Sequence, residues 1–167
     1  MSDKPLQHRF DVLCQITRAQ HFAWRAAVAD LCPDVDPAAV TDKMWELTGV
    51  QTGAAYAKRL DRSKPIAAQV AASIVWSSEC MGEDAIVEIG EGADEAFVRH
   101  HDCPWFHWHK RLDLLAEDRP GCDMWFSTSV DRVNEACGTT LRVETLEALP
   151  DGDSCCLRRF WVEQPTP

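Results

Sequence analysis

Histidine side chains concentrate in the segment 99–109, which holds four of the six histidines of the chain and one cysteine, Cys103. A thiol beside an imidazole can act as a nucleophile with its own base. If the backbone stays extended, His101 and Cys103 share a face, because side chains two apart in a strand point the same way. A one-residue bulge would reverse this arrangement. Pro104 suits the first turn of a helix, whose free N–H groups lower the pKa of a thiol at its start. The spacing predicts an activated Cys103 with His101 as its base, and the alternative is that both are ordinary structural residues.

Further cysteines offer a possible metal site. Cys103, Cys122 and Cys156, together with a histidine, would suit tetrahedral zinc. The sequence contains no Cys-x-x-Cys or His-x-x-x-His pair, which would be the usual chelating element. Free cysteines are also common in protein cores, where they act as small apolar residues. We therefore expect no cofactor, with zinc bound by these three thiols as the alternative.

Aromatic and basic side chains could complete a pocket for a small molecule. Trp105 and Trp125 could form its flat apolar walls, although core packing is the other interpretation. His109 borders the apolar stripe of its predicted helix and could reach the same pocket. Arg158 lies in a predicted strand and could bind a carboxylate, because an inward guanidinium is costly without an anionic partner. An inward arginine would therefore indicate an acidic substrate.

Periodic apolar residues predict the elements that must position these side chains. Helical spacing covers 6–31, 37–57 with an interruption or a bend near the glycines at 49–53, and 65–82. The period then falls to two, which predicts a hairpin of strands 85–89 and 96–102. Two helices follow, separated by a break at 119–121, and a second hairpin is formed by strands 141–148 and 155–163.

This order predicts an α+β fold. The two hairpins can pair into one antiparallel four-stranded sheet in a β-β-α-α-β-β arrangement, with the N-terminal helices packed alongside. A chain of 167 residues suits one domain. We expect an N-terminal helical part at 1–63, a helix plus the α+β core at 64–163, and a tail at 164–167.

Charge and composition restrict the partners. The net charge of −10 and the sequence pI near 4.9 disfavour binding to nucleic acid or to anionic membranes. No run of about 18 apolar residues and no signal-peptide pattern is present, so we expect a cytoplasmic protein with reduced thiols. The expected partner is a small-molecule substrate, and a homo-oligomer is possible.

Several spaced residues resemble the L-2-amino-thiazoline-4-carboxylic acid hydrolase-like family over about 64–163. The resemblance rests on Cys103-Pro104, on Cys122 at the start of an aromatic helix, on Asn134 near its end, and on Gly152-Asp153-Ser154-Cys155-Cys156. Members often carry a second cysteine four residues after the one that matches Cys122, and this chain has Phe126 there. That departure argues against a full cysteine metal cluster.

The resemblance implies a cytosolic α+β hydrolase that opens a heterocyclic C–N or C–S bond without an organic cofactor. Cys103 would attack an amidine-like carbon, His101 would be its base, and Asp153 would bind the ring nitrogen or position water. The remaining predicted substrate contacts are Trp105, His109, Cys122, Trp125, Asn134 and Arg158. The main alternative is a sensor-like module that binds a small ligand or a metal without turnover, and another is a structural subunit that uses its tryptophans at an interface.

Overall fold

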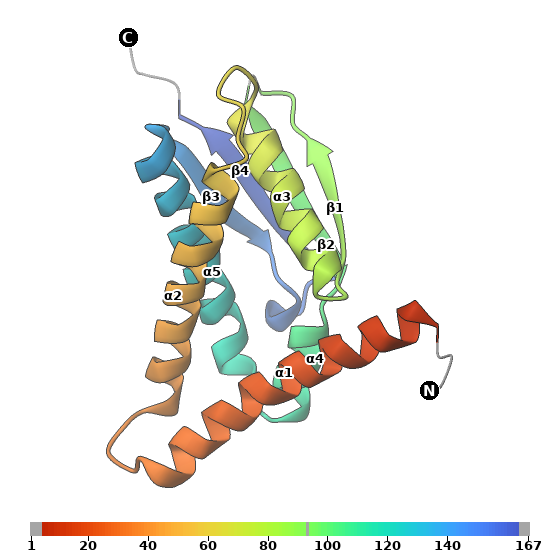
Figure 1. The fold of residues 1–167 in the computed structure, drawn as a ribbon, viewed down its shortest axis with the longest axis vertical. Helices are drawn as coiled ribbons and strands as arrows, with labels where there is room; N and C mark the ends of the chain where they lie inside the picture. Colours follow the sequence, from red (N-terminus) through yellow and green to blue (C-terminus); the bar gives the residue numbers. More distant parts are fainter. Residues whose placement is uncertain (1–4, 93, 164–167) are drawn as a thin grey trace.

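The computed structural model describes residues 5–92 and 94–163. Three helices come first in the chain, and two pairs of strands follow with two helices between them (Figure 1). The helices are α1 (Leu6–Leu31), α2 (Pro37–Ala57), α3 (Ile66–Cys80), α4 (Pro104–Arg111) and α5 (Leu115–Cys137). The strands are β1 (Asp84–Ile89), β2 (Glu95–Asp102), β3 (Leu141–Glu147) and β4 (Cys156–Val162), and a short 3-10 helix, η1 (Leu149–Asp151), connects the last two. The predicted tail at 164–167 lies outside the described residues.

The strands form one antiparallel sheet in the order β1-β2-β4-β3. Each hairpin pairs its own two strands, and β2 pairs with β4 to join the hairpins. The predicted α+β class and its β-β-α-α-β-β core are therefore confirmed. The pairing of β2 with β4 lies in the middle of the sheet, and it places His100 opposite Cys156.

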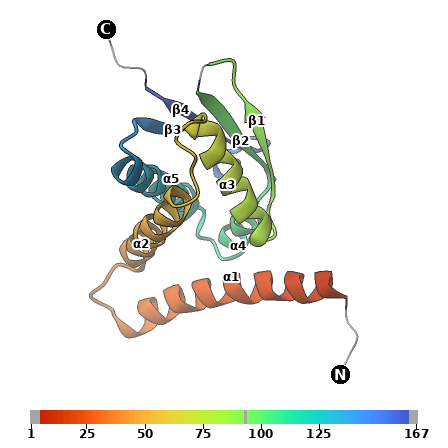
Figure 2. The same cartoon turned by 45° about the horizontal axis from the view of Figure 1, so that its top comes forward.

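The hydrophobic core lies between the sheet and the helices that cover it. Alternate residues of β2, Ala96 and Val98, are fully buried, and Phe160 of β4 is fully buried beside them. Val70 and Ile74 of α3 pack against this surface. Figures 1 and 2 show α3 and α5 over the sheet, with α2 alongside α5. Burial of these apolar side chains is the main stabilising contribution to the core.

Helix α2 is continuous from Pro37 to Ala57, so the predicted interruption at its glycines is wrong. Gly49 and Gly53 instead lie where α2 crosses α5 at close range. A Cβ at Gly53 would lie 2.3 Å from the carbonyl oxygen of Ser129, and one at Gly49 would lie 2.9 Å from that of Trp125. The glycines therefore allow two backbones to approach, and tertiary packing outweighs their low helix propensity.

The predicted helix break at 119–121 is also wrong. Helix α4 ends at Arg111, a turn with Asp113 at φ 59° follows, and α5 contains Pro120 within its second turn. Gly121 lies against the indole of Trp45, where a Cβ would come within 2.6 Å of a ring atom. Gly121 therefore allows close packing against Trp45, and it does not end a helix.

Helix α1 lies across one end of the fold (Figure 2). Its Arg18 donates a hydrogen bond of 2.7 Å to the carbonyl oxygen of Met81, and its Arg25 forms a bidentate ion pair with Glu117 of α5. Phe22 stacks on Trp108 with the rings 5.4 Å apart. Within 5–92 and 94–163, no helix combines the length and apolarity that a membrane span requires.

Candidate functional site

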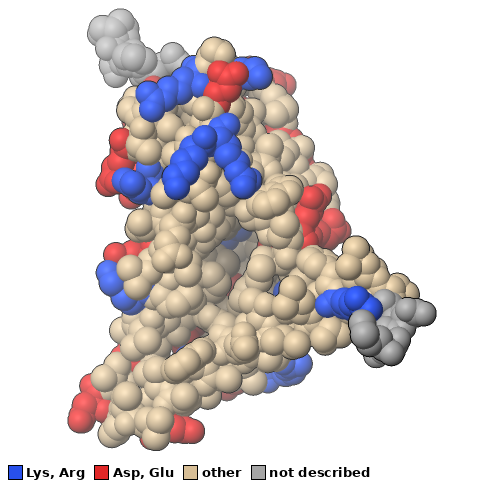
Figure 3. All heavy atoms as spheres, in the orientation of Figure 1, with Lys and Arg blue, Asp and Glu red and all other residues tan. Residues whose placement is uncertain are grey.

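A cavity of about 280 Å³ lies between the helices and the end of the sheet. Its wall combines residues of α2, α3, β2, α4, α5 and β4. Figure 3 shows the molecular surface hollowed between α2 and α3, just above α1 in that view, with mostly uncharged residues around the hollow. Aromatic side chains dominate the cavity wall: Trp45, Trp105, Trp125 and Phe126.

A bulge at the end of β2 decides which histidine reaches this cavity. Asp84 pairs with Asp102 and the next residue, Ala85, pairs with His100, so His101 is an extra residue in the ladder. His100 is 5% exposed and lines the cavity, whereas His101 is exposed. The expected arrangement of His101 and Cys103 on one face therefore does not form, because the bulge shifts the alternation by one residue.

Cys103 lies in the cavity wall at the start of α4, as predicted from Pro104. Burial raises the pKa of this thiol well above its ordinary value, and the neighbouring Cys122 and Glu83 act in the same direction. The backbone N–H of Phe106 acts in the opposite direction and is weaker than burial. The helix start is therefore present, but desolvation favours the neutral thiol.

Two more thiols, Cys122 and Cys156, line the same cavity. Burial raises the pKa of Cys122 to about 12, although the charge of Arg158 lowers it in part. The Cys156 sulfur accepts a hydrogen bond from the backbone N–H of Leu149 at 3.3 Å. Across the described part of the chain, no group of three or more His, Cys, Asp or Glu side chains is arranged to hold a metal ion. Zinc at Cys103, Cys122 and Cys156 stays an untested alternative to the expectation of no cofactor.

A buried histidine and carboxylate form one polar part of the wall. His109 and Asp118 are each 3% exposed, and the Nδ1 atom of His109 lies 3.3 Å from Asp118 Oδ2. The same nitrogen lies 3.0 Å from the carbonyl oxygen of Trp105, to which it can donate. Asp118 Oδ2 has no hydrogen-bond partner among the described residues. The carboxylate therefore has capacity to accept from another molecule.

A second polar group surrounds His100. Its Nε2 shares a hydrogen bond of 2.9 Å with the Ser78 hydroxyl and lies 3.4 Å from Glu83 Oε2. The indole N–H of Trp105 donates to the other oxygen of Glu83 at 2.9 Å. The Nδ1 atom of His100 is buried without a partner in the described structure. Unpartnered buried polar atoms are uncommon in native proteins, and they are a feature of sites that bind ligands or water.

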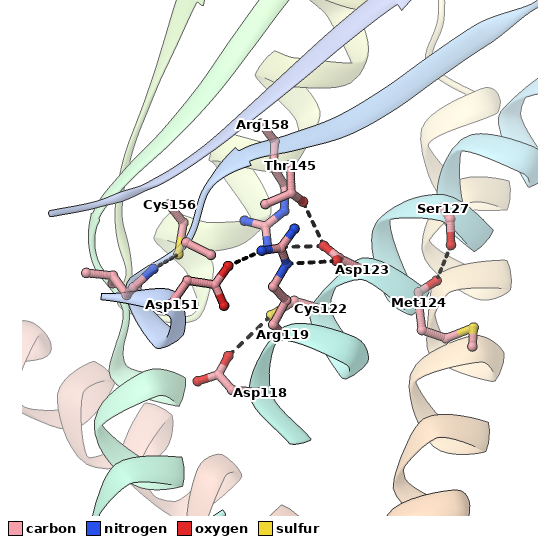
Figure 4. Close-up of polar contacts among 12 residues, drawn as sticks. Asp118, Arg119, Cys122, Asp123, Met124, Ser127, Thr145, Asp151, Cys156 and Arg158 are labelled. Carbon is pink, nitrogen blue, oxygen red and sulfur yellow. Dashed lines mark hydrogen bonds and ion pairs between the residues drawn. The ribbon is translucent and has the colours of Figure 1, made fainter. Parts of the chain in front are cut away.

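Arg158 extends from β4 toward α5, as Figure 4 shows. It is 3% exposed, and its guanidinium carbon lies 4.2 Å from the centroid of the Phe126 ring. Its nearest carboxylate oxygen is Asp123 Oδ1, at 3.9 Å. Arg158 is therefore the inward arginine of the strands, whereas Arg99 and Arg159 pair with Glu88 and Glu95 at more open positions. Its role in binding a carboxylate stays a prediction.

Trp105, His109, Cys122, Trp125 and Arg158, all predicted substrate contacts, meet in this cavity together with Cys103. Asp153 lies in the turn before β4, where its carboxylate accepts from the backbone N–H of Ala148 at 2.8 Å. Asn134 binds both backbone groups of Leu141, which joins the end of α5 to β3. Neither residue lines the cavity, so the structure brings neither of them, nor His101, to Cys103.

The sequence reasoning missed His100, Glu83, Asp118 and Trp45. His100 continues the alternation of Ala96 and Val98 in β2, so the period of two was a usable signal. Trp45 and Asp118 come from different helices and meet only in the tertiary structure, for which the sequence pattern carries no signal.

Aromatic rings from α1 cover the outer side of the site. His21 lies 5.3 Å from the ring of Trp45 and 5.4 Å from that of Trp105, measured between ring centroids. Burial, and to a smaller extent the charge of His109, lower the pKa of His21 to about 4. His21 is therefore neutral near pH 7 and acts there as a packing residue.

The chain matches no family model and no curated protein. Its fold is similar to those of solved structures that include the following two. One is trafficking protein particle complex subunit 3 from Naegleria fowleri covalently bound to palmitic acid, with a TM-score of 0.53, 14% identity, and coverage of 92% of this chain and 97% of that chain. The other is the phenol-responsive sensory domain of the transcription activator PoxR with phenol, with a TM-score of 0.52, 17% identity, and coverage of 87% and 74%. At these identities the similarity shows a shared fold.

Proposed function

We propose that this chain binds a small, largely apolar organic molecule in the cavity between α2, α3, α5 and the sheet, as a sensor-like module without turnover. The observation that carries the proposal is an aromatic-walled cavity of about 280 Å³. An apolar cavity of about 150 Å³ is large enough to bind benzene. This cavity therefore suits a single ring with one polar substituent.

The polar atoms of the wall support binding of a molecule with an oriented polar group. His100, Asp118 and Arg158 each line the cavity and each have a buried side-chain atom without a hydrogen-bond partner among the described residues. Small-molecule sites are typically apolar surfaces with a few such polar groups, which fix the orientation of the ligand.

The two structural neighbours support the same interpretation. The PoxR sensory domain carries phenol and the Naegleria subunit carries palmitic acid, so this fold accommodates apolar molecules in other proteins. Phenol is also small enough to fit in the cavity of this chain. We therefore use phenol as the first probe.

The hydrolase hypothesis has a weaker physical basis. It needs a Cys103 thiolate with a base beside it, but burial raises the pKa of Cys103, and His101 is exposed. His100 lines the cavity and would be the nearer candidate for a base. Opening of a heterocyclic C–N or C–S bond stays a prediction, and no step of the binding proposal depends on it.

Titration with phenol, followed by tryptophan fluorescence and calorimetry, tests the proposal. We expect a Kd of about 1 mM or tighter, given the ligand efficiencies of very small ligands. Thr52→Phe places a ring in the cavity and should weaken binding by at least about tenfold. Gln51→Phe, on the exposed side of the same helix, is the matched control and should bind as the wild type does. Equal binding by all three proteins would place phenol elsewhere and contradict the proposal.

A further inference from the structure

Arg158 is a buried cation whose hydrogen-bonding capacity is not used within the described protein. Its contacts there are the ring of Phe126 and a 3.9 Å approach to Asp123, which is longer than a hydrogen bond. Its Nε atom is buried without a partner. A guanidinium has five N–H donors, and leaving a buried donor unpaired is costly.

Asp123 does not supply the missing partner, because other groups occupy it. Arg119 donates from Nε to Asp123 Oδ2 at 3.3 Å, and Thr145 donates its hydroxyl to Oδ1 at 2.7 Å. Arg119 also binds Asp151, as Figure 4 shows. Asp123 is therefore shared among several donors, and Arg158 lies at the inner end of this network beside the cavity.

The two carboxylates that line the cavity, Glu83 and Asp118, form no hydrogen bond or ion pair with Arg158 in the described structure. Glu83 accepts from Trp105 and lies beside His100, and Asp118 lies beside His109. The Cys122 thiol stays neutral near pH 7, because burial raises its pKa to about 12. No thiolate at Cys122 therefore competes for the guanidinium.

We infer that the ligand of this cavity is a small monocarboxylic acid with an apolar ring, whose carboxylate binds Arg158 while its ring lies among the tryptophans. This inference rests on the proposed binding function and names its ligand class. The planar guanidinium matches a carboxylate in a bidentate arrangement, which supplies two charge-assisted hydrogen bonds. Apolar walls around the ring exclude water and strengthen this interaction.

Benzoate and benzamide form a suitable probe pair, because they share a ring and a planar substituent but differ in charge. Each is titrated calorimetrically at pH 7 into the wild type. We expect benzoate to bind at least about 30-fold more tightly than benzamide, as for a buried charge pair. Benzamide binding as tightly as benzoate would overturn the inference and leave the proposed function standing.

Variants of adjacent arginines assign the effect to one residue. Arg158→Met should raise the Kd for benzoate by at least about 30-fold and change the Kd for benzamide by less than about threefold. Arg159 is the next residue of β4, is partly exposed and pairs with Glu95. Arg159→Met should therefore leave the Kd values for benzoate and benzamide unchanged. If Arg158→Met does not fold, as judged by circular dichroism, the wild-type preference still decides the inference. If neither probe nor phenol binds the wild type, the proposed function fails together with the ligand class.

Discussion

The guanidinium carbon of Arg158 lies 4.2 Å from the centroid of the Phe126 ring, at the inner end of a network that continues through Asp123 and Arg119. A cation over an aromatic face is stabilised by the ring quadrupole, which offsets part of the cost of burying the charge. The contact also fixes the guanidinium at the cavity wall. The cavity therefore has a charged end near Arg158 and an aromatic remainder.

Cysteine labelling should separate the buried thiols from the exposed ones. Burial raises the pKa of both Cys103 and Cys122, so both should be neutral and shielded near pH 7.5. Iodoacetamide should modify the exposed Cys32 and Cys80 first, as mapped by mass spectrometry. Labelling in denaturant is the control, because all sites should then react alike. Preferential labelling of Cys103 in the folded protein would restore the thiolate required by the hydrolase hypothesis.

The stability of the fold should decrease as the pH falls from 6.5 to about 4, in part because of His21. Its pKa is lowered from 6.5 to about 4 in the fold by burial, so the unfolded chain binds more protons in this window. After allowance for solvent screening, this contribution is about 2 kcal/mol. It is fully present above pH 6.5 and is lost as the pH falls.

Urea unfolding of His21→Phe at pH 7 and pH 4.5 measures this contribution. The variant should lose less stability on acidification than the wild type, by about 2 kcal/mol. His101→Phe, at an exposed position, should retain the pH dependence of the wild type. An identical pH dependence in all three proteins would show that His21 titrates normally.

The crossing of α2 and α5 should not tolerate a methyl group at Gly53. Its Cβ would lie 2.3 Å from the backbone oxygen of Ser129, so the helices must separate. We expect Gly53→Ala to lower the free energy of unfolding by about 2 kcal/mol, although alanine has the higher helix propensity. Ala55→Gly, on the exposed side of the same helix, should cost about 1 kcal/mol through propensity alone. A stabilised Gly53→Ala protein would mean that the helices do not cross at this distance.

Asn134 should prove to be structural. Its amide oxygen accepts from the backbone N–H of Leu141 at 2.8 Å and its amide nitrogen donates to the carbonyl of the same residue at 2.9 Å. Asn134→Ala should therefore cost about 2 kcal/mol of stability while the Kd for phenol stays within about twofold. Thermal melting and calorimetry on the same samples measure both. Lost binding at unchanged stability would instead support the predicted role of Asn134 in substrate binding.

The order and type of the elements could be predicted from the sequence, because apolar periodicity and turn residues are local signals. The helices that cover the sheet and both hairpins follow from such signals. The glycines at 49, 53 and 121 were misread, because their reason is contact with a partner helix or with Trp45. A local pattern cannot distinguish a glycine that ends a helix from one that allows a close helix crossing.

Only part of the candidate site could be predicted, because local signals place residues within an element but do not show how elements meet. Cys103, Trp105 and Arg158 line the cavity as expected, since each could be placed by its own element. His101 was expected in the place that His100 takes, because a single bulge reverses the alternation at the end of β2. A bulge of this kind depends on pairing with β1, which the sequence of β2 alone does not encode.

The position of a bound probe tests the binding proposal most directly. With the methionine methyl groups labelled with ¹³C, NMR spectra are recorded as phenol is added. Met81 lines the cavity and Met124 is exposed on α5. We predict a saturable shift of the Met81 methyl signal with nuclear Overhauser contacts to the phenol ring, and no change at Met124. Phenol contacts at Met124 alone, or no saturable shift of Met81 up to about 10 mM phenol, a concentration well above the expected Kd, would contradict the proposal.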